Sequence, residues 1–348
     1  MKSRIKLVGV DLGFGFTKGF DGQRAVIMPS ILAENGRPPA TSPVAHPLIE
    51  EDLHLAFEDA TFFAGNRADC DWLSPQVPRQ AERLFGDYGR RLVLAVLATY
   101  TEMETPLMVV IGLPVSHYQR LKDAFETRLI GYHKVAWVRP DGSRVPKNVH
   151  IRKIRTVPHP MGTYSGLIMN AEGRMRADKF KDQKTIVVDI GFRTTNVITM
   201  DRMRFSNRYS GTIALGISRG FEQIAHKLKA ETGRSPSFDQ LYQAVRLGSI
   251  HIDGQHYKIE RVRREAFSRL AEQLADNIGY LLSAAWDIDS LLLTGGGSRD
   301  LAEYIGPLLP GEVSQIENEQ DVRLNNVQGQ LRLARSFWGA SGFCEQGG

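Results

Sequence analysis

The same short pattern, an apolar run that ends in Asp-x-Gly, occurs twice in this chain, half a chain apart. The first copy is Val8-Gly-Val-Asp11-Leu-Gly13 and the second is Val187-Val-Asp189-Ile-Gly191. The two aspartates are 178 residues apart in a chain of 348 residues. A duplication on this scale predicts two similar α/β domains, each built around a buried strand that ends in an aspartate.

The first half alternates predicted strands and helices. Apolar runs predict strands over residues 5–10, 16–20, 24–28, 60–65 and 107–111, and helical spacing predicts helices over 78–104, 117–130 and 161–170. Asp21-Gly22 and Asp141-Gly142 are hairpin signals. Residues 29 to about 59, which include five prolines, are expected to form an irregular insertion.

The second half repeats this order. Strands are expected over 185–189, 196–200 and 290–293, a hairpin over 251–258, and helices over 217–232, 238–246, 262–286 and 326–337. The charged stretch 171–184 is expected to be a mobile loop or an interdomain link. We therefore expect domain I to span 1–170 plus a C-terminal helix at about 325–348, with an insertion at about 29–90. Domain II is expected over 171–324, with an insertion at about 218–275.

Composition excludes several classes of protein. No window of about 18 residues lacks charges, so no membrane span is expected, and the apolar run after the basic start is too short for a secretory signal. Two cysteines, Cys70 and Cys344, cannot form a disulfide framework and fit a cytoplasmic location. The net charge of +5 is mild, and the basic runs at 150–155 and 261–264 lack interleaved aromatics, so no direct nucleic-acid partner is expected.

The first Asp-x-Gly segment continues as Asp11-Leu-Gly13-Phe-Gly15-Phe-Thr17-Lys18. Gly13 and Gly15 permit positive φ and close backbone approach, so this turn can aim backbone N–H groups at phosphate oxygens. Lys18 adds a cation, and the Asp11 carboxylate suits a hydrated Mg²⁺. Taken alone, the segment is equally well explained as a plain β-turn with a surface lysine.

Two further segments strengthen the phosphate interpretation. The second turn, Asp189-Ile-Gly191-Phe-Arg193-Thr194-Thr195-Asn196, repeats the aspartate and glycine and adds hydroxyls that can bind phosphate. About 100 residues later, Leu291-Leu-Leu-Thr-Gly295-Gly296-Gly297-Ser298 places three glycines between a strand and a probable helix. Together, the two hairpins predict that one polyphosphate and one metal ion are bound between them, with one hairpin on each side.

These residues resemble the ATPase superfamily of actin, heat-shock chaperones and sugar kinases. Within it, the chain is most similar to prokaryotic actin-like ATPases of the ParM/StbA type and their archaeal relatives. The resemblance covers essentially the whole chain. It rests on residues 11–18, Gly112-Leu-Pro114, Pro158-His-Pro-Met-Gly162, residues 189–196, Leu215-Gly-Ile217 and Asn326-Val-Gln-Gly329.

The resemblance implies an actin-like fold, with two duplicated, ribonuclease H-like α/β domains and a nucleotide cleft between them. It further implies an ATPase that converts ATP to ADP and phosphate and polymerises into dynamic filaments. The implied partners are further copies of the chain and a possible DNA-binding adaptor, in plasmid DNA segregation or another cytoskeletal role.

The resemblance also assigns site residues. Asp11 and Asp189 would hold Mg²⁺ through water, and Asp11, Asp189 and His159 would be catalytic. The nucleotide would contact three groups of residues, with the helix at 217–232 bordering the base. These groups are Gly13, Phe14, Gly15, Phe16, Thr17 and Lys18; Gly191, Arg193, Thr194 and Thr195; and Gly295, Gly296, Gly297 and Ser298.

One position departs from the family pattern. The family usually has Gln or Glu where this chain has His159, to position the attacking water. An imidazole can orient water or act as a base, but a structural histidine there would leave hydrolysis slow. Two alternative functions share the fold: a small-molecule kinase, and a non-filamentous regulatory or scaffold protein.

Overall fold

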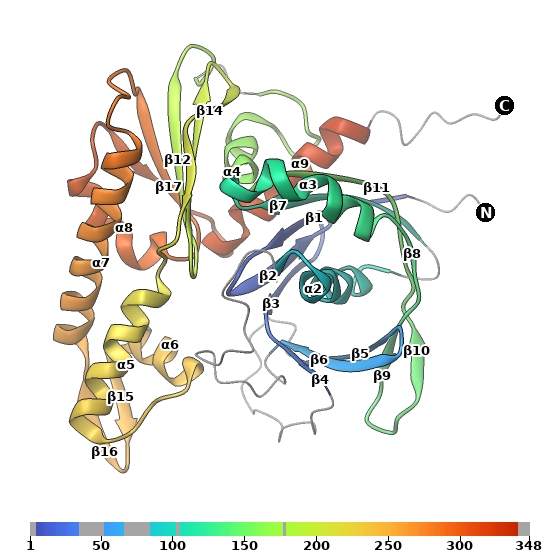
Figure 1. Cartoon of the computed structure of the whole chain (residues 1–348), viewed down its shortest axis with the longest axis horizontal. Helices are drawn as coiled ribbons and strands as arrows, with labels where there is room; N and C mark the ends of the chain where they lie inside the picture. Colours follow the sequence, from blue (N-terminus) through green and yellow to red (C-terminus); the bar gives the residue numbers. More distant parts are fainter. Residues whose placement is uncertain (1–4, 35–51, 66–83, 102–104, 177–178, 340–348) are drawn as a thin grey trace. The chain divides into compact units, whose positions relative to one another are not determined.

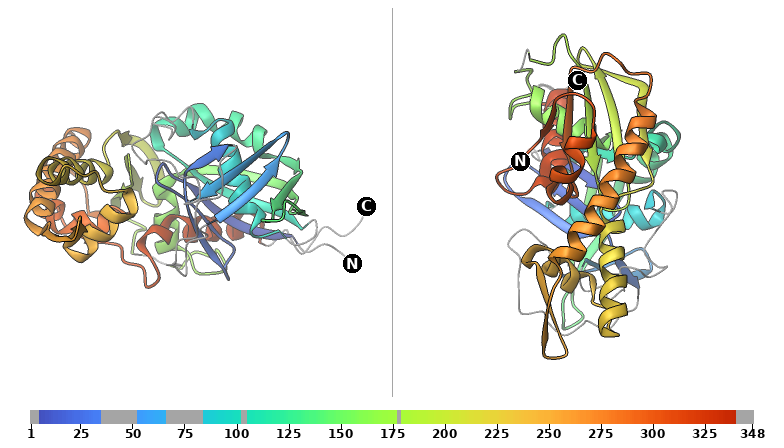
Figure 2. Two further views of the ribbon diagram at one scale, coloured as in Figure 1. Left: turned by 90° about the horizontal axis from the view of Figure 1, so that it is seen from below. Right: turned by 90° about the vertical axis from the view of Figure 1, so that its left-hand side faces the viewer.

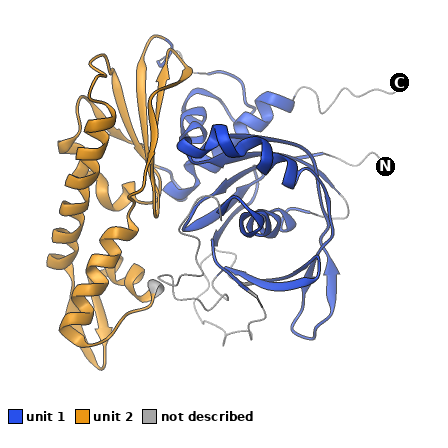
Figure 3. Ribbon diagram, viewed as in Figure 1, with its two compact units in different colours: residues 1–70, 75–181, 318–348 blue, residues 71–74, 182–317 orange. Residues whose placement is uncertain are grey.

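The computed structural model describes residues 5–34, 52–65, 84–101, 105–176 and 179–339 (Figure 1). The chain divides into two compact units (Figure 3). Unit 1 comprises residues 1–70, 75–181 and 318–348, and unit 2 comprises residues 71–74 and 182–317. Each unit contains helices packed on a mixed sheet, which confirms the predicted α/β class.

Unit 1 is built on a six-stranded sheet in the order β3-β2-β1-β7-β11-β8. β1 pairs antiparallel with β2 and parallel with β7, and β7 pairs parallel with β11. The β1, β2 and β7 strands lie where the apolar runs predict them. The strand bounds are Ala25–Pro29 for β3, Phe16–Phe20 for β2, Lys6–Leu12 for β1, Pro106–Leu113 for β7, Val149–Pro158 for β11 and Gly131–His133 for β8.

Alternation along β1 decides which helices cover each face of this sheet. Val8, Val10 and Leu12 are fully buried on the face covered by α2 (Asp87–Ala98) and α3 (Val115–Leu129). On the other face, a Cβ at Gly9 would lie 2.3 Å from the Val327 carbonyl oxygen. That close approach lets α9 (Asn325–Trp338) rest directly on β1, beside α4 (His159–Ile168) (Figure 1).

A second sheet of unit 1 has the order β10-β9-β5-β6-β4. Two of its strands lie inside the predicted irregular insertion, so that expectation is wrong at 32–34 and 52–57. Leu53, Leu55 and Phe57 are buried on one face of β5, and this alternation outweighs the proline content nearby. Residues 35–51 lie outside the described residues. The bounds are Arg144–Pro146 for β10, Val135–Val138 for β9, Asp52–Phe57 for β5, Ala60–Gly65 for β6 and Leu32–Glu34 for β4.

Unit 2 repeats the strand order of unit 1. Its five-stranded sheet runs β14-β13-β12-β17-β18, with the directions found in β3-β2-β1-β7-β11. The edge strands β14 and β18 were not predicted. The β14 segment is rich in polar residues and lacks an apolar run, and β18 is only three residues long. The bounds are Arg204–Ile213 for β14, Thr195–Asp201 for β13, Lys184–Ile190 for β12, Ser290–Thr294 for β17 and Val313–Gln315 for β18.

Over the described part of unit 2, residues 182–317, four α-helices and a hairpin accompany this sheet. Phe221 on α5 and Phe267 on α7 meet edge to face, and the two helices lie side by side in the further views (Figure 2). α7 ends at Leu281, five residues before the predicted end. The bounds are Ser218–Thr232 for α5, Phe238–Leu247 for α6, Glu260–Leu281 for α7, Ser298–Ile305 for α8, and Ser249–Ile252 and Gln255–Lys258 for the hairpin of β15 and β16.

Several expectations concern residues that the structure does not describe. Cys70, Cys344 and the first six residues of the predicted 78–104 helix lie outside the described ranges; the described α2 begins at Asp87. Within those ranges, no helix is long and apolar enough to cross a membrane.

Candidate functional site

The turn between β1 and β2 is closed by backbone hydrogen bonding. The Gly13 N–H donates to the Phe16 carbonyl oxygen at 3.1 Å. Neither Gly13 nor Gly15 has a positive φ, so neither residue uses the wider range of dihedral angles that glycine permits. Gly13 is required for another reason: a Cβ there would lie 2.9 Å from the Phe16 oxygen. Close approach, rather than special dihedral angles, explains the glycine at position 13.

Buried hydroxyls anchor this turn to the strand beside it. Thr17 is fully buried, and its Oγ1 lies 2.8 Å from the Ser30 Oγ. The Ser30 hydroxyl donates to the Gly13 carbonyl oxygen at 2.6 Å, and the Ser30 N–H donates to the Gly15 carbonyl oxygen at 2.9 Å. The turn is therefore held in one conformation, with its carbonyls engaged by Ser30.

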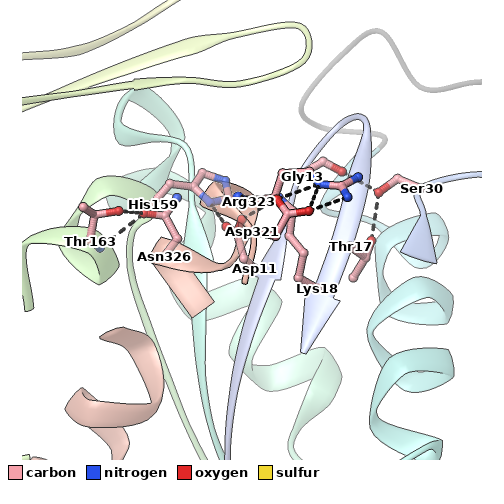
Figure 4. A network of polar contacts seen from close by, with 10 residues as sticks. All are labelled: Asp11, Gly13, Thr17, Lys18, Ser30, His159, Thr163, Asp321, Arg323 and Asn326. Carbon is pink, nitrogen blue, oxygen red and sulfur yellow. Dashed lines mark hydrogen bonds and ion pairs between the residues drawn. The ribbon is translucent and has the colours of Figure 1, made fainter. Parts of the chain in front are cut away.

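Asp11, at the end of β1, lies between two basic side chains (Figure 4). Lys18, which faces Asp11 across the strand pair, donates from Nζ to Asp11 Oδ2 at 2.7 Å. His159, the first residue of α4, places Nδ1 2.5 Å from Asp11 Oδ1. Asp11 and His159 are both buried. The structure thus brings His159 next to two predicted site residues of the first turn, although it follows Asp11 by 148 residues in the sequence.

Burial and charge act on Asp11 in opposite directions. Burial alone would raise the pKa of the Asp11 carboxyl, because it removes water from the charged form. The Lys18 ammonium and His159 outweigh burial and hold the pKa of Asp11 well below its ordinary value. The carboxylate is therefore charged at neutral pH.

Two residues that the sequence did not single out shape this contact. Gly112 faces Asp11 from β7, and a Cβ there would lie 2.8 Å from His159 Nδ1 and 2.5 Å from the Gln330 amide. Gln330 is fully buried on α9. With its amide oriented to satisfy both groups, it donates to the Val10 carbonyl oxygen at 2.6 Å and accepts from the Gly112 N–H at 3.3 Å. Gly112 was noted only as part of a motif, and Gln330 lacked any motif signal.

The helix that begins with His159 is fixed by α9. Asn326 Oδ1 accepts from the Thr163 hydroxyl at 2.7 Å and from its backbone N–H at 3.3 Å. Close by, Arg323 forms an ion pair with Asp321 at 2.6 Å (Figure 4). Its guanidinium also lies over the Phe16 ring, 4.9 Å from the centroid. Arg323 is a further cation beside the first turn, and the sequence reasoning missed it.

The turn between β12 and β13 in unit 2 has the same backbone pattern. The Gly191 N–H donates to the Thr194 carbonyl oxygen at 2.9 Å, and a Cβ at Gly191 would also lie 2.9 Å from that oxygen. Thr195 is fully buried and donates from Oγ1 to the Leu215 carbonyl oxygen at 2.8 Å. Asp189 is buried between its strand neighbours Asn196 and Thr294.

The glycine-rich segment after β17 packs directly on this second turn. Gly295 has a φ of +88°, and a Cβ there would lie 2.1 Å from Asp189 Oδ1. The Gly297 N–H donates to the Ile190 carbonyl oxygen at 2.8 Å, and the Ser298 hydroxyl donates to the Gly295 carbonyl oxygen at 2.8 Å. The predicted residues of 189–195 and 295–298 therefore form one cluster.

The start of α5 joins this cluster. The Ile217 N–H donates to the Gly191 carbonyl oxygen at 3.0 Å, and the Ser218 N–H donates to the Phe192 carbonyl oxygen at 2.8 Å. Unit 2 thus gathers a second group of predicted residues, as unit 1 gathers the first. Over the described ranges, no group of three or more His, Cys, Asp or Glu residues is arranged to hold a metal ion.

Two family models match this chain. "Actin like proteins N terminal domain" matches residues 9–162, and "Archaeal actin homologue MreB-like, C-terminal" matches residues 187–306. Each match contains one aspartate hairpin. An archaeal actin homolog of Thermoplasma volcanium is 25% identical over 337 residues, which cover 93% of this chain and 97% of the relative.

Solved structures agree with the family models. An archaeal actin homolog in complex with ADP aligns with a TM-score of 0.76 and 21% identity, over 94% of this chain and 99% of that one. A subunit of a 15-stranded ParM filament from Clostridium botulinum aligns with a TM-score of 0.74 and 18% identity, over 96% of this chain and 100% of that one. These matches confirm the actin-like fold.

Proposed function

Because this chain belongs to the actin-like protein family, we propose that it is an ATPase that binds Mg²⁺-ATP and assembles into filaments. The observation that carries the proposal is the repeated hairpin, with one buried aspartate in each unit and the same hydrogen-bonded turn. We expect both hairpins to contact the polyphosphate of one nucleotide, and the 295–298 segment to contact its adenosine. One of the solved relatives binds ADP, and another forms filaments.

In unit 1, we assign the phosphate contacts to Lys18 and to the backbone of the 13–16 turn. Lys18 is mostly buried and ends beside the turn glycine, since a Cβ at Gly13 would lie 3.4 Å from Lys18 Nζ. Charge-assisted hydrogen bonds between an ammonium and phosphate oxygens are stronger than neutral ones. A γ-phosphate would therefore compete with Asp11 for the Lys18 ammonium.

The carboxylates fit a hydrated magnesium ion. Both oxygens of Asp11 already accept contacts from Lys18 and His159, and we assign Asp11 to the metal through water. This agrees with the preference of Mg²⁺ to keep several of its waters. When bound, Mg²⁺ would neutralise charge on the phosphates. We assign Asp11 and Asp189 to the water molecules around it.

His159 is assigned to the attacking water. The contact with Asp11 engages Nδ1 of His159. In a neutral His159 whose proton is on Nδ1, the other ring nitrogen, Nε2, can accept a proton from water. The fixed position of α4 against Asn326 and Gln330 keeps the ring in place. A histidine held in this way can take a proton from water during transfer of the γ-phosphoryl group.

The test combines phosphate release with sedimentation. With Mg²⁺-ATP and no acceptor, we expect one phosphate for each ADP, and with ATP or a non-hydrolysable analogue we expect pelletable filaments above a critical concentration. Transfer of phosphate only to an added acceptor would indicate a kinase. ATP binding by a protein that remains monomeric at high concentration, with or without a crowding agent, would indicate a regulatory or scaffold protein.

A further inference from the structure

Residues 131–151 form one continuous two-stranded ribbon that belongs to both sheets of unit 1. Tyr132 lies opposite His150 in the β8–β11 pair, and Val138 lies opposite Arg144 in the β9–β10 pair. Between these two strand pairs, the Lys147 N–H donates to the Val135 carbonyl oxygen at 2.8 Å. This bond follows the same register, so the two pairs form one ribbon. The ribbon therefore has one inward face and one outward face along its whole length.

The positive charge of the chain is concentrated in this ribbon and the strand that follows it. Residues 131–155 contain seven of the 44 lysines and arginines and one of the 39 acidic residues, a net charge of +6. The remaining 323 residues contain 37 basic and 38 acidic side chains, a net charge of −1. The mild charge of the whole chain thus conceals one strongly basic segment.

Exposed basic side chains predominate on one face of the ribbon and buried apolar ones on the other. Val135, Val149 and Ile151 are buried on the inward face, which also carries Lys147 opposite Val135. The exposed residues include Tyr132, Lys134, Arg144 and Arg152 on the outward face, where Val138 lies opposite Arg144, together with residues 139–143 of the turn. Pairing with β5 ends at Trp137, so the turn projects beyond the sheet (Figure 1).

Three carboxylates lie beside the ribbon or the strand that follows it. The Asp141 carboxylate accepts from the Ser143 N–H at 2.8 Å, stays charged and offsets one of the seven basic side chains, so the net charge of residues 131–155 remains +6. Glu58, next to the strand that pairs with β9, forms an ion pair with Arg90, outside the ribbon, at 3.0 Å. Glu126 accepts from the Thr156 N–H and hydroxyl, both at 2.7 Å.

We propose that the outward face of the ribbon binds the phosphate backbone of double-stranded nucleic acid. A two-stranded antiparallel ribbon has dimensions that the major groove of a duplex admits, and lysines and arginines bind phosphates by releasing counterions. This departs from the expectation of no nucleic-acid partner, which treated 150–155 as an isolated run. The strand pairing adds Lys134, Arg139 and Arg144 to that run.

The side chains favour a duplex over a single strand or a membrane. Lys147 covers the Trp137 ring at 4.4 Å, which leaves Tyr132 as the exposed aromatic ring of the ribbon, whereas proteins that bind single strands stack successive bases on several such rings. The projecting turn, Arg139-Pro-Asp-Gly-Ser-Arg144, has no large apolar side chain to insert into a bilayer.

The test uses fluorescence anisotropy of a labelled 24-base-pair duplex of arbitrary sequence with the full chain and no nucleotide. Contacts from Lys134, Arg139, Arg144 and Arg152 predict a slope of log affinity against log salt of roughly −3.6, or about 10²-fold weaker binding between ~50 and ~200 mM salt. Arg139→Glu/Arg144→Glu should weaken binding by roughly 50-fold and reduce the slope by about 2. Both positions are exposed, so thermal unfolding should be unchanged.

The matched control is Arg261→Glu/Arg264→Glu, which makes the same change of charge at exposed positions of α7. The proposal requires this control to bind as the unaltered protein does. An equal loss in the control would overturn it, since net charge alone would then explain binding. Absence of binding at ~50 mM salt, or tighter binding to a single strand of equal charge or to phosphatidylserine vesicles, would also overturn it.

Discussion

The hairpins at residues 11–18 and 189–196 have the same backbone but different side-chain chemistry. In both, the glycine two residues after the aspartate donates to the residue three positions further on, at 3.1 Å from Gly13 and 2.9 Å from Gly191. In both, the sixth residue after the aspartate is a fully buried threonine with its hydroxyl engaged, Thr17 and Thr195.

The residues around each aspartate differ in charge. Asp11 faces Lys18 across the strand pair and also contacts His159. Asp189 faces Asn196 at the equivalent position and Thr294 on the other side. The comparison indicates that the two hairpins share the turn, while the groups paired with the aspartates differ. We infer that unit 1 supplies a cation and a base beside Asp11, whereas the strand neighbours of Asp189 are neutral and polar and the cation of the second hairpin is Arg193.

The largest expected effect comes from removing either aspartate. Asp11→Ala and Asp189→Ala should each lower kcat by roughly 10³-fold, as expected when a group that stabilises transition-state charge is lost. Asp11→Ala should also lower the free energy of unfolding strongly, by about 3 kcal/mol, because it leaves the mostly buried Lys18 ammonium without its carboxylate. Wild-type turnover in both variants would refute the site assignment, and an unchanged free energy of unfolding in Asp11→Ala would contradict the role given to this ion pair.

His159→Ala should lower kcat by roughly 10²-fold and leave ATP affinity unchanged, because a positioned acid–base group acts on the chemical step. His133→Ala is the matched control. His133 is equally buried in unit 1, but it contacts the Leu129 carbonyl oxygen at 2.7 Å instead of an aspartate. Single-turnover hydrolysis and nucleotide titration would measure the two quantities. An unchanged rate in His159→Ala would return this residue to a structural role.

The sequence predicted the parts of the fold that depend on buried strands. The apolar runs before Asp11 and Asp189, and the duplication between them, gave the two central strands and their turns. The edge strands β14 and β18 were missed because polar or very short strands lack the apolar pattern, and β5 was obscured by nearby prolines. The observed ends of helices differ by a few residues from the predicted ends where no capping residue marks the end in the sequence.

The sequence was sufficient to name the residues of the candidate site in unit 1 but not to predict which of them are in contact. Asp11, Lys18 and His159 were each identified, but no spacing rule brings residues 11 and 159 to 2.5 Å. That contact depends on the register of β1, β7 and β11, which places Gly112 beside both residues. Gln330 and Arg323 could not be found in the sequence, because a buried amide or an ion pair on a helix has no local signature.

Lys18→Asn would give unit 1 the residue that unit 2 has at the equivalent position. ATP should bind roughly 10- to 100-fold more weakly, since a hydrogen bond to a charged group contributes about 1.5–3 kcal/mol. Lys6→Asn is the control, because Lys6 pairs with Asp21 at 3.2 Å on the same sheet but is partly exposed. Calorimetric titration would measure both affinities. Equal affinities in the two variants would indicate that Lys18 serves Asp11 alone.

Stability should respond to pH in opposite directions through Asp11 and Asp300. Burial raises the pKa of Asp300 on α8, only partly offset by Arg299, whereas the partners of Asp11 lower its pKa. The contribution of Asp11 is therefore present above about pH 4 and lost in acid, whereas that of Asp300 is present in acid and lost as pH rises past its folded pKa. Unfolding of Asp11→Asn and Asp300→Asn between about pH 3 and pH 7 would measure this, and slopes of the same sign would contradict it.

The smallest expected effect concerns the two equivalent threonines. Thr17→Val and Thr195→Val keep the side-chain shape but remove a buried hydroxyl, so each should lower the free energy of unfolding by about 1–2 kcal/mol. The two losses should agree within about 0.5 kcal/mol, since each hydroxyl has one engaged partner at 2.8 Å. Urea unfolding would measure the two losses of stability.

The ATP affinity of each threonine variant should fall less than about threefold, because both hydroxyls are already bonded within their own unit. A tenfold loss in one variant would mean that its hydroxyl turns to the phosphate, and the hairpins would then differ in backbone-anchoring chemistry as well as in charge.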